Sequence, residues 1–176
     1  AAASDERGLL LVVTGNGKGK STAAFGMVAR ALGHGMKVGV VQFIKSRTDT
    51  GEEAFLGTQP GVEWHVTGDG FTWDTQNREQ DIATAGRGWE IAARMLADPA
   101  YQLVVLDELT YLLSYGYLDS DSVLDALAQR PAMQHVVVTG RAAPDALIDL
   151  ADTVSVVADR KHAFRAGVKA QPGIDF

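Results

Sequence analysis

Short apolar runs recur along the chain, and the segments between them carry apolar residues three or four positions apart. The run LLLVV at residues 9–13 is short and rich in branched side chains, which is typical of a buried strand. Elsewhere apolar residues lie three or four positions apart, as on one buried face of a helix, at Ile82, Ala85, Trp89, Ala92 and Leu96. The two patterns predict strands over residues 9–14, 38–44, 62–66, 103–106, 135–139 and 153–157, and helices over 21–32, 75–97, 120–129 and 144–150.

This alternation of strands and helices predicts βαβ units, and therefore a mainly parallel sheet with helices on both faces. We expect a three-layer α/β/α fold of the P-loop NTPase type with roughly six strands, in a single domain over residues 1–176. Residues 45–59 are polar and are expected to form a long excursion with at most a short helical turn. The tail, residues 161–176, has no clear period, and residues 1–7 are expected to be disordered or vector-derived.

Composition narrows the function classes. The net charge of -6 argues against a general nucleic-acid or membrane-surface binder. The absence of cysteine excludes disulfides, thiolate catalysis and cysteine-held metals. The apolar runs are far shorter than the roughly 20 residues of a membrane helix, and the opening AAASDERG does not resemble a secretory signal. We therefore expect a cytoplasmic protein.

The segment TGNGKGKST, residues 14–22, is a candidate phosphate-binding loop between a predicted strand and a predicted helix. Glycines let successive backbone N–H groups point inward, and the helix adds its positive end. Lys20 would contact phosphate and Ser21 would bind Mg²⁺. The loop is one residue shorter than the usual pattern, with Thr14 at the expected first glycine. The nucleotide-binding candidates are Gly15, Asn16, Gly17, Lys18, Gly19, Lys20, Ser21, Thr22 and, more weakly, Arg30.

Two carboxylates and one guanidinium are predicted at the same edge of the sheet. Asp107 and Glu108 end the buried run LVVLDE, so either could hold Mg²⁺ directly or through water. Alone, such a pair could also mark the start of a helix. Arg141 follows the strand at 135–139 and suits phosphate charge, although an exposed loop arginine is an equally good reading of its position.

From the residues alone, the sequence indicates a magnesium–nucleoside triphosphate site but does not name a reaction. A nucleotide-hydrolysing switch or motor could use Glu108 to position water. A small-molecule kinase could use residues 45–59 as a lid over its acceptor. A non-catalytic nucleotide-binding module would bind ATP without turnover. Each alternative predicts different products from ATP.

Five segments occur together: TGNGKGKSTAAFG, GVVQFIK, GFTWDTQNRE, VVLDELTY and KHAFRAGVKAQPGID. In combination they resemble the bacterial ATP:corrinoid adenosyltransferases, the family called CobA, BtuR or CobO. The resemblance runs from Arg7 to the end of the chain. GFTWDTQNRE and KHAFRAGVKAQ are its most specific parts, because general nucleotide binding does not require them.

The resemblance implies transfer of the 5′-deoxyadenosyl group of ATP to Co(I) of a corrinoid, with release of triphosphate, in adenosylcobalamin synthesis or salvage. It implies a nucleotide that lies reversed in the loop. The leaving triphosphate would be stabilised by Lys20, by the loop amides and by Mg²⁺ held near Ser21 and either Asp107 or Glu108. Arg141 is a further candidate for this role.

The resemblance also implies apolar side chains at the lower axial position of cobalt, which leave the metal four-coordinate and easier to reduce. The matching residues here are Phe71 and Trp73, which would otherwise read as core aromatics. Asp69 stands where the family more usually has a small or neutral residue. The four histidines (His34, His65, His135 and His162) show no metal-ligand spacing and are interpreted as structural or surface residues, with His162 in the family-like tail.

Three further expectations come from the resemblance. A reductase, a flavoprotein, would supply electrons to cobalt, and the chain would form a homodimer. Family members commonly carry a helical extension ahead of the first strand, whereas this sequence begins a few residues before Leu9.

Overall fold

The structure is a computed structural model, and it describes residues 2–44, 47–68 and 77–176. The described residues form one sheet of six parallel strands in the order β3-β2-β4-β5-β1-β6. This confirms the predicted parallel α/β sheet. The strands are β1 (Leu10–Thr14), β2 (Val38–Gln42), β3 (Val62–Val66), β4 (Leu103–Asp107), β5 (His135–Thr139) and β6 (Thr153–Val156).

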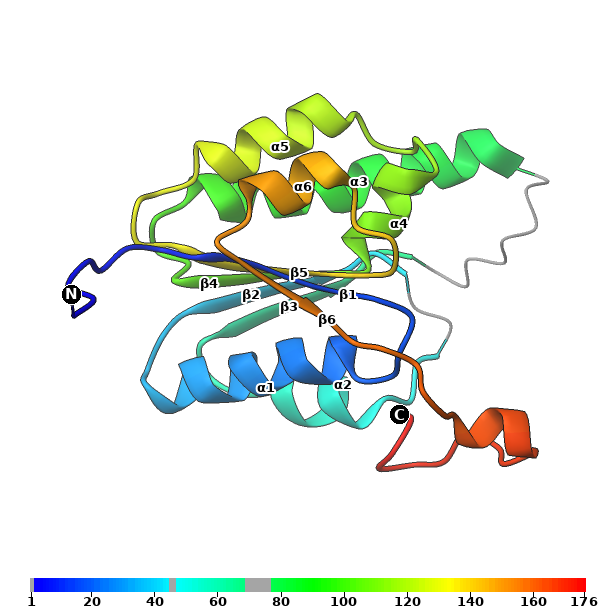
Figure 1. The fold of residues 1–176 in the computed structure, drawn as a ribbon. Helices are drawn as coiled ribbons and strands as arrows, with labels where there is room; N and C mark the ends of the chain where they lie inside the picture. Colours follow the sequence, from blue (N-terminus) through cyan, green and yellow to red (C-terminus); the bar gives the residue numbers. More distant parts are fainter. Residues whose placement is uncertain (1, 45–46, 69–76) are drawn as a thin grey trace.

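Helices cover both faces of this sheet (Figure 1). One face carries α1 (Lys20–Gly33) and α2 (Gly51–Leu56). The other carries α3 (Arg78–Ala97), α4 (Leu109–Ser114), α5 (Ser120–Ala128) and α6 (Asp145–Leu150), and a 3-10 helix (Ala163–Ala166) lies in the tail. None of the helices in the described part of the chain is long and apolar enough to cross a membrane.

The predicted elements are largely found, with differences at their ends. The strands over 62–66 and 135–139 have the predicted bounds, and most other elements shift by one or two residues. The described part of α3 begins at Arg78, and residues 75–76 of the predicted helix lie outside the described residues. Within the polar excursion, α2 has six residues, slightly more than the short turn expected. The sequence analysis missed α4 and the 3-10 helix, because both are too short to show a clear helical period.

The core consists of two apolar clusters, one on each face of the sheet. In β4, Val104 and Leu106 belong to the cluster under α3–α6, whereas Leu103 and Val105 belong to the cluster over α1. All four side chains are buried, which explains why this strand reads as a continuous apolar run. The sheet is therefore a rigid base for the loops at both of its edges.

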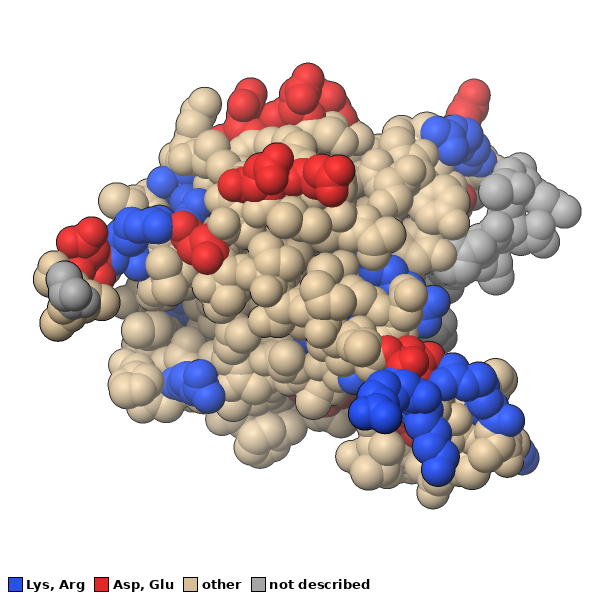
Figure 2. All heavy atoms as spheres, in the orientation of Figure 1, with Lys and Arg blue, Asp and Glu red and all other residues tan. Residues whose placement is uncertain are grey.

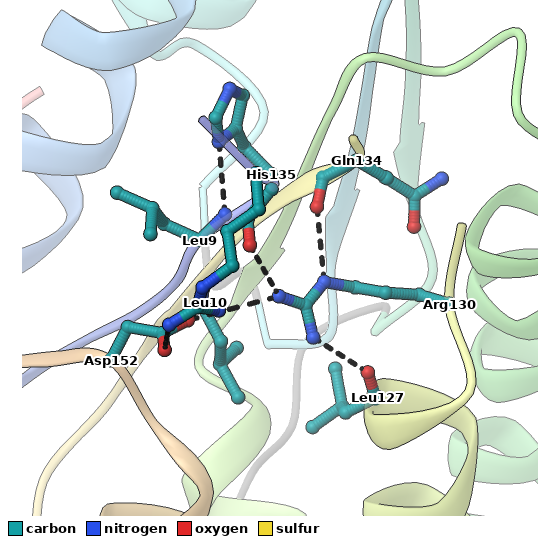
Figure 3. Close-up of polar contacts among 9 residues, drawn as sticks. Leu9, Leu10, Leu127, Arg130, Gln134, His135 and Asp152 are labelled. Atoms are coloured by element: carbon teal, nitrogen blue, oxygen red, sulfur yellow. Dashed lines mark hydrogen bonds and ion pairs between the residues drawn. The ribbon is translucent and has the colours of Figure 1, made fainter. Parts of the chain in front are cut away.

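At the edge where the strands begin, Arg130 holds three chain segments together (Figure 3). Its guanidinium donates to the carbonyl oxygens of Gln134 at 3.0 Å, Leu127 at 2.7 Å and Gly8 at 3.1 Å. It also lies 3.9 Å from a carboxylate oxygen of Asp152. These part-buried hydrogen bonds tie the backbone of three segments to one side chain, so Arg130 is a structural residue.

Asp152 anchors the start of β1 at the same edge (Figure 3). Its carboxylate accepts a hydrogen bond from the Leu10 N–H at 2.8 Å and forms an ion pair with Arg7. These contacts hold the pKa of Asp152 below its usual value. The Nδ1 atom of His135 accepts the neighbouring Leu9 N–H at 3.1 Å, which agrees with the structural role expected for this histidine. Arg130 and Asp152 are thus paired within the protein, whereas the buried Oε1 atom of Gln134 at this edge has no hydrogen-bond partner among the described residues.

Candidate active site

A pocket of about 780 Å³ opens at the opposite edge of the sheet, where β1, β4 and β5 end. The phosphate-binding loop lines one part of it and the start of α2 another. A third part is lined by residues 159–176, which we call the C-terminal segment. Its lining residues are Asn16, Gly17, Lys18, Gly19, Lys20, Ser21, Thr22, Phe25, Gly51, Glu52, Glu108, Arg141, Asp159, His162, Phe164, Arg165, Gly173, Ile174, Asp175 and Phe176.

The phosphate-binding loop is held tightly against the chain that follows β6. Gly15 has a φ of 104°, and a Cβ atom there would lie 2.3 Å from the Val157 carbonyl oxygen, so only glycine fits. The Gly17 N–H donates to the same carbonyl oxygen at 2.9 Å. Thr14, which replaces the usual first glycine, accepts a hydrogen bond from the Ala143 N–H at 3.1 Å through its hydroxyl. The shortened loop is therefore tied to its neighbours on both sides.

Lys20 is the first residue of α1 and is buried, with 9% of its surface exposed. Its ammonium donates to the Gly17 carbonyl oxygen at 2.6 Å, across the loop. Burial lowers the pKa of Lys20, the nearby Glu108 carboxylate opposes this, and Arg141 adds to it. The preceding Gly19 offers no side-chain cap, so the helix presents its first N–H groups to the pocket. A cation and a positive helix end thus converge on one point.

Asp107 lies beneath the loop and is 3% exposed. Its Oδ1 atom accepts hydrogen bonds from the hydroxyls of Ser21 at 2.7 Å and Thr139 at 2.8 Å. Its Oδ2 atom accepts one from the Gln42 amide at 3.3 Å. Burial raises the pKa of Asp107, and these three hydrogen bonds oppose the rise. The carboxylate fixes the Ser21 hydroxyl in place but does not line the pocket.

Glu108, by contrast, lines the pocket directly. Its backbone is left-handed, with φ of 63°, and its N–H donates to the Thr139 hydroxyl at 2.9 Å. Burial and the neighbouring Asp107 raise the pKa of Glu108, and Lys20 and Arg141 oppose this. An unusual backbone conformation that turns a carboxylate into a pocket suggests a functional role.

Arg141 reaches the same pocket from the loop after β5. The Thr110 hydroxyl donates to the Arg141 carbonyl oxygen at 2.8 Å, which joins this loop to α4. The structure therefore brings Lys20, Glu108 and Arg141 together at one pocket, although they come from three separate parts of the chain. The parallel sheet does this, because its strands all end at one edge.

The C-terminal segment is the part of the pocket that sequence reasoning missed. Lys18 of the phosphate loop lies 3.5 Å from the Asp175 carboxylate, so the tail and the loop are in contact. Arg165 makes two hydrogen bonds to Asp159, at 2.7 and 2.9 Å. The guanidinium of Arg47 lies 3.4 Å from the centroid of the Phe176 ring. The motif KHAFRAGVKAQPGID was the available signal, but no periodicity showed where it would fold.

Positive charge gathers on this C-terminal segment, whereas acidic side chains lie over α5 and α6 on the other side of the sheet (Figure 2). The basic residues of the segment are Arg160, Lys161, Arg165 and Lys169. A protein with a net charge of -6 thus keeps a basic surface beside the pocket. Such an arrangement favours the approach of a polyanion.

Not every predicted site residue reaches the pocket. Arg30 lies in the last turn of α1, away from the loop, and is exposed. Phe71, Trp73 and Asp69 lie outside the described residues. His162 does line the pocket, and its Nδ1 atom accepts the Phe164 N–H at 3.1 Å.

The donor set at this edge fits magnesium. A hydroxyl and carboxylates are the hard oxygen ligands that Mg²⁺ prefers, together with waters and substrate phosphates. In the described residues, no group of three or more His, Asp or Glu side chains could hold a metal alone.

Comparisons with known proteins agree with this geometry. A family model described as ATP:corrinoid adenosyltransferase BtuR/CobO/CobP matches residues 6–176. A corrinoid adenosyltransferase of Pseudomonas aeruginosa is 62% identical over 177 residues, which cover 100% of this chain and 87% of the relative. Two further relatives are 56% identical, each over 100% of this chain and 89% of its own length. They are the corrinoid adenosyltransferase of Escherichia coli K12 and the corrinoid adenosyltransferase CobA of Salmonella typhimurium.

Proposed function

This chain belongs to the ATP:corrinoid adenosyltransferase family BtuR/CobO/CobP, and we propose that it transfers the 5′-deoxyadenosyl group of ATP to the Co(I) centre of a corrinoid. ATP and a corrinoid are therefore its substrates, and triphosphate is the product that leaves. The reaction belongs to adenosylcobalamin synthesis or salvage.

The observation that carries this proposal is the convergence of Lys20, Arg141 and the first N–H groups of α1 on one pocket. Adenosyl transfer makes a highly charged leaving group, and stabilising that charge is the main demand on the protein. Buried positive charge is more effective here than exposed charge, because water screens it less. Lys20 meets this requirement in part, because its side chain is largely buried while it still lines the pocket.

The chemistry needs no protein base. The electron pair of Co(I) attacks the ribose 5′-carbon, the Co–C bond forms, and the C5′–O bond breaks. The electron pair of that bond leaves with triphosphate, and cobalt becomes formally Co(III). The protein contributes alignment of the reacting atoms and stabilisation of the departing oxygen. Family resemblance implies that the nucleotide lies reversed in the loop, so that its 5′-carbon faces the corrinoid.

We assign different roles to the two carboxylates. Glu108 faces the pocket and would hold Mg²⁺ with the Ser21 hydroxyl. Asp107 would orient that hydroxyl by accepting a hydrogen bond from it. Mg²⁺ bound there supplies positive charge to the triphosphate. Glu108 is then a metal-site carboxylate and not the base of a hydrolase.

Several parts of this proposal come from the family alone. Phe71 and Trp73 would fill the lower axial position of cobalt, and a flavoprotein reductase would supply the electron for Co(II). We further propose a homodimer in the cytoplasm. Each of these points can be tested separately from the transfer reaction.

The direct test mixes the protein with Mg-ATP and chemically reduced cobalamin under anaerobic conditions. We expect a light-sensitive alkylcobalt spectrum and the release of intact triphosphate. Nucleoside diphosphate with inorganic phosphate would indicate a hydrolase, and a phosphorylated acceptor would indicate a kinase. Either result, or saturable ATP binding without turnover, would overturn the proposal.

A further inference from the structure

A column of aromatic rings begins on α4, three residues after Glu108 of the pocket, and continues into the residues that follow the helix. Tyr111 and Tyr115 are four residues apart, and their rings stack with centroids 4.9 Å apart and planes 12° apart. The ring of Tyr117 continues the column, 5.9 Å from that of Tyr115. Tyr115 is 49% exposed and Tyr117 is buried. We call Tyr111, Tyr115 and Tyr117 the tyrosine column.

The end of α4 that carries Tyr111 is fixed to the active site. The helix begins directly after Glu108, so Tyr111 is three residues from a carboxylate that lines the pocket. Thr110 joins the helix to the Arg141 loop through its 2.8 Å hydrogen bond. Gly140 has a φ of 140°, and a Cβ atom there would lie 1.9 Å from the Thr110 hydroxyl, so the two segments are in close contact. The position of Tyr111 relative to the pocket is therefore well defined.

The other end of the column is held by Arg78 at the start of α3. The Arg78 guanidinium lies 4.9 Å from the centroid of the Tyr117 ring and donates to the Tyr115 carbonyl oxygen at 3.2 Å. Figure 1 shows α4 next to the beginning of α3, at the edge of the sheet where the strands end. The column is thus a preorganised wall, supported from behind by α3 and beginning at the active site.

We propose that Tyr111 and Tyr115 form one wall of the corrinoid site and contact the rim of the macrocycle while its cobalt faces the ATP pocket. This inference rests on the proposed function. A corrinoid is a broad ring system whose rim carries methyl groups and carboxamides. Tyrosine rings can pack against the methyl groups, and tyrosine hydroxyls can bond to the carboxamides. Preorganised aromatic surface of this kind binds with little entropic cost.

The place of the column favours a substrate over a protein partner. Tyr111 is three residues from Glu108, and the neighbouring Thr110 is hydrogen-bonded to the Arg141 carbonyl oxygen. The column therefore begins close to two residues that line the pocket. A corrinoid must reach this same edge, because cobalt has to meet the 5′-carbon of the nucleotide.

The test measures the Kd for cob(II)alamin in the presence of Mg-ATP by an absorbance titration. We expect Tyr115→Ala to raise this Kd about five- to tenfold, because an aromatic contact is lost, and to leave the Kd for ATP unchanged. Tyr115→Phe keeps the ring and should remain within about twofold of the wild type. In turnover, Tyr115→Ala should raise the KM for corrinoid with little change in kcat. The control is Met133→Ala, which removes another exposed apolar side chain, 58% exposed, at the opposite edge of the sheet.

The outcomes separate this inference from the proposed function. If the wild type neither binds nor alkylates a corrinoid, both fail. If the wild type is active and Tyr115→Ala binds cob(II)alamin as tightly as Met133→Ala does, the inference alone is overturned. A Tyr115→Ala defect seen only in subunit association, or only with a protein reductase, would assign the column to a protein interface and would also overturn it.

Discussion

The two edges of this sheet carry similar residue types and use them in opposite ways. Where the strands begin, Arg130 and Asp152 are paired with each other and with backbone groups, and the pKa of Asp152 is lowered. Where the strands end, burial lowers the pKa of Lys20 and raises that of Glu108. Both shifts oppose the charged form. Burial also lowers the pKa of Arg130, so the shifts alone do not separate the two edges. The difference is that Arg130 is paired with Asp152 and backbone carbonyl groups, whereas Lys20 and Glu108 line a pocket.

This difference leads us to expect ligands at the edge where the strands end. A charge that is already well paired gains little from a substrate, whereas a desolvated charge gains much. The family activity needs a triphosphate to leave, and the end of the sheet with Lys20, Glu108 and Arg141 can stabilise it. Mutations at the two edges should therefore have separable effects: activity at one, stability at the other.

The largest effect is expected for Lys20→Ala. Removing the buried ammonium should lower kcat by about a hundredfold or more, because leaving-group stabilisation is lost. Steady-state formation of alkylcobalamin measures this. Lys37→Ala, an exposed lysine at the opposite edge, is the control and should retain activity. Activity of Lys20→Ala close to that of the control would refute the role of Lys20.

Glu108→Gln should have the next largest effect. The amide keeps the shape of the side chain but removes a charged magnesium ligand, so the Mg²⁺ concentration needed for half-maximal activity should rise about tenfold or more. A titration of activity with Mg²⁺ at saturating ATP gives this value. A similar rise in Asp107→Asn with none in Glu108→Gln would reverse the roles assigned to the two carboxylates.

Phe71→Ala and Trp73→Ala test the reduction step. Each should cause a larger loss when corrinoid is supplied as Co(II) with a reductase than as prereduced Co(I), because the side chains are needed to leave cobalt four-coordinate. Parallel assays with the two substrates give the ratio. Equal losses in both assays would indicate a packing role.

At the opposite edge, Arg130→Ala should affect stability and not chemistry. It leaves the Gly8, Leu127 and Gln134 carbonyl oxygens without their donor, which should lower the free energy of unfolding by about 2 to 3 kcal/mol. Denaturant unfolding measures this change in stability. A separate assay measures kcat at a temperature where the variant is folded. Arg94→Ala, which removes an exposed ion pair with Glu63, should destabilise less. A kcat loss in folded Arg130→Ala would contradict the separation of the edges.

The smallest effect is a pH dependence of stability at Asp152. Its pKa is lower in the folded protein than in the unfolded chain, mainly because of the hydrogen bond from Arg7. The folded state then binds this proton less tightly. The stabilisation is fully present above the unfolded pKa and is lost as the pH falls through the folded pKa. Asp152→Asn should reduce the loss of stability between neutral and acid pH, and unchanged pH dependence would remove Asp152 as its source.

Local pattern predicted most of the fold, and the reasons for its failures are physical. The strand β5 was located because it contains a compact apolar run, and β3 because apolar residues alternate with Glu63 and His65 along it. The helix α4 was missed because its six residues are too few to show a clear helical period. The loop residues of the site were identified because glycine, lysine and serine at this spacing, between a strand and a helix, are typical of a phosphate-binding loop.

Contacts between distant segments could not be predicted in this way. Asp107 and Glu108 are adjacent in sequence, yet only the sheet geometry places one beneath Ser21 and the other in the pocket. The C-terminal segment is placed by contacts between residues far apart in the sequence, such as Asp175 with Lys18 and Phe176 with Arg47. Neither arrangement leaves a local pattern in the sequence.

The central claim is that the bond between the 5′-carbon and its oxygen breaks and that triphosphate leaves whole. It can be tested with ATP that carries a heavy oxygen isotope at the 5′ bridging position, together with cob(I)alamin. Mass spectrometry of the products locates the isotope. We predict that triphosphate carries the label and that the adenosyl group on cobalt carries none. Label that stays with the adenosine product, accompanied by free phosphate or diphosphate, would contradict the account.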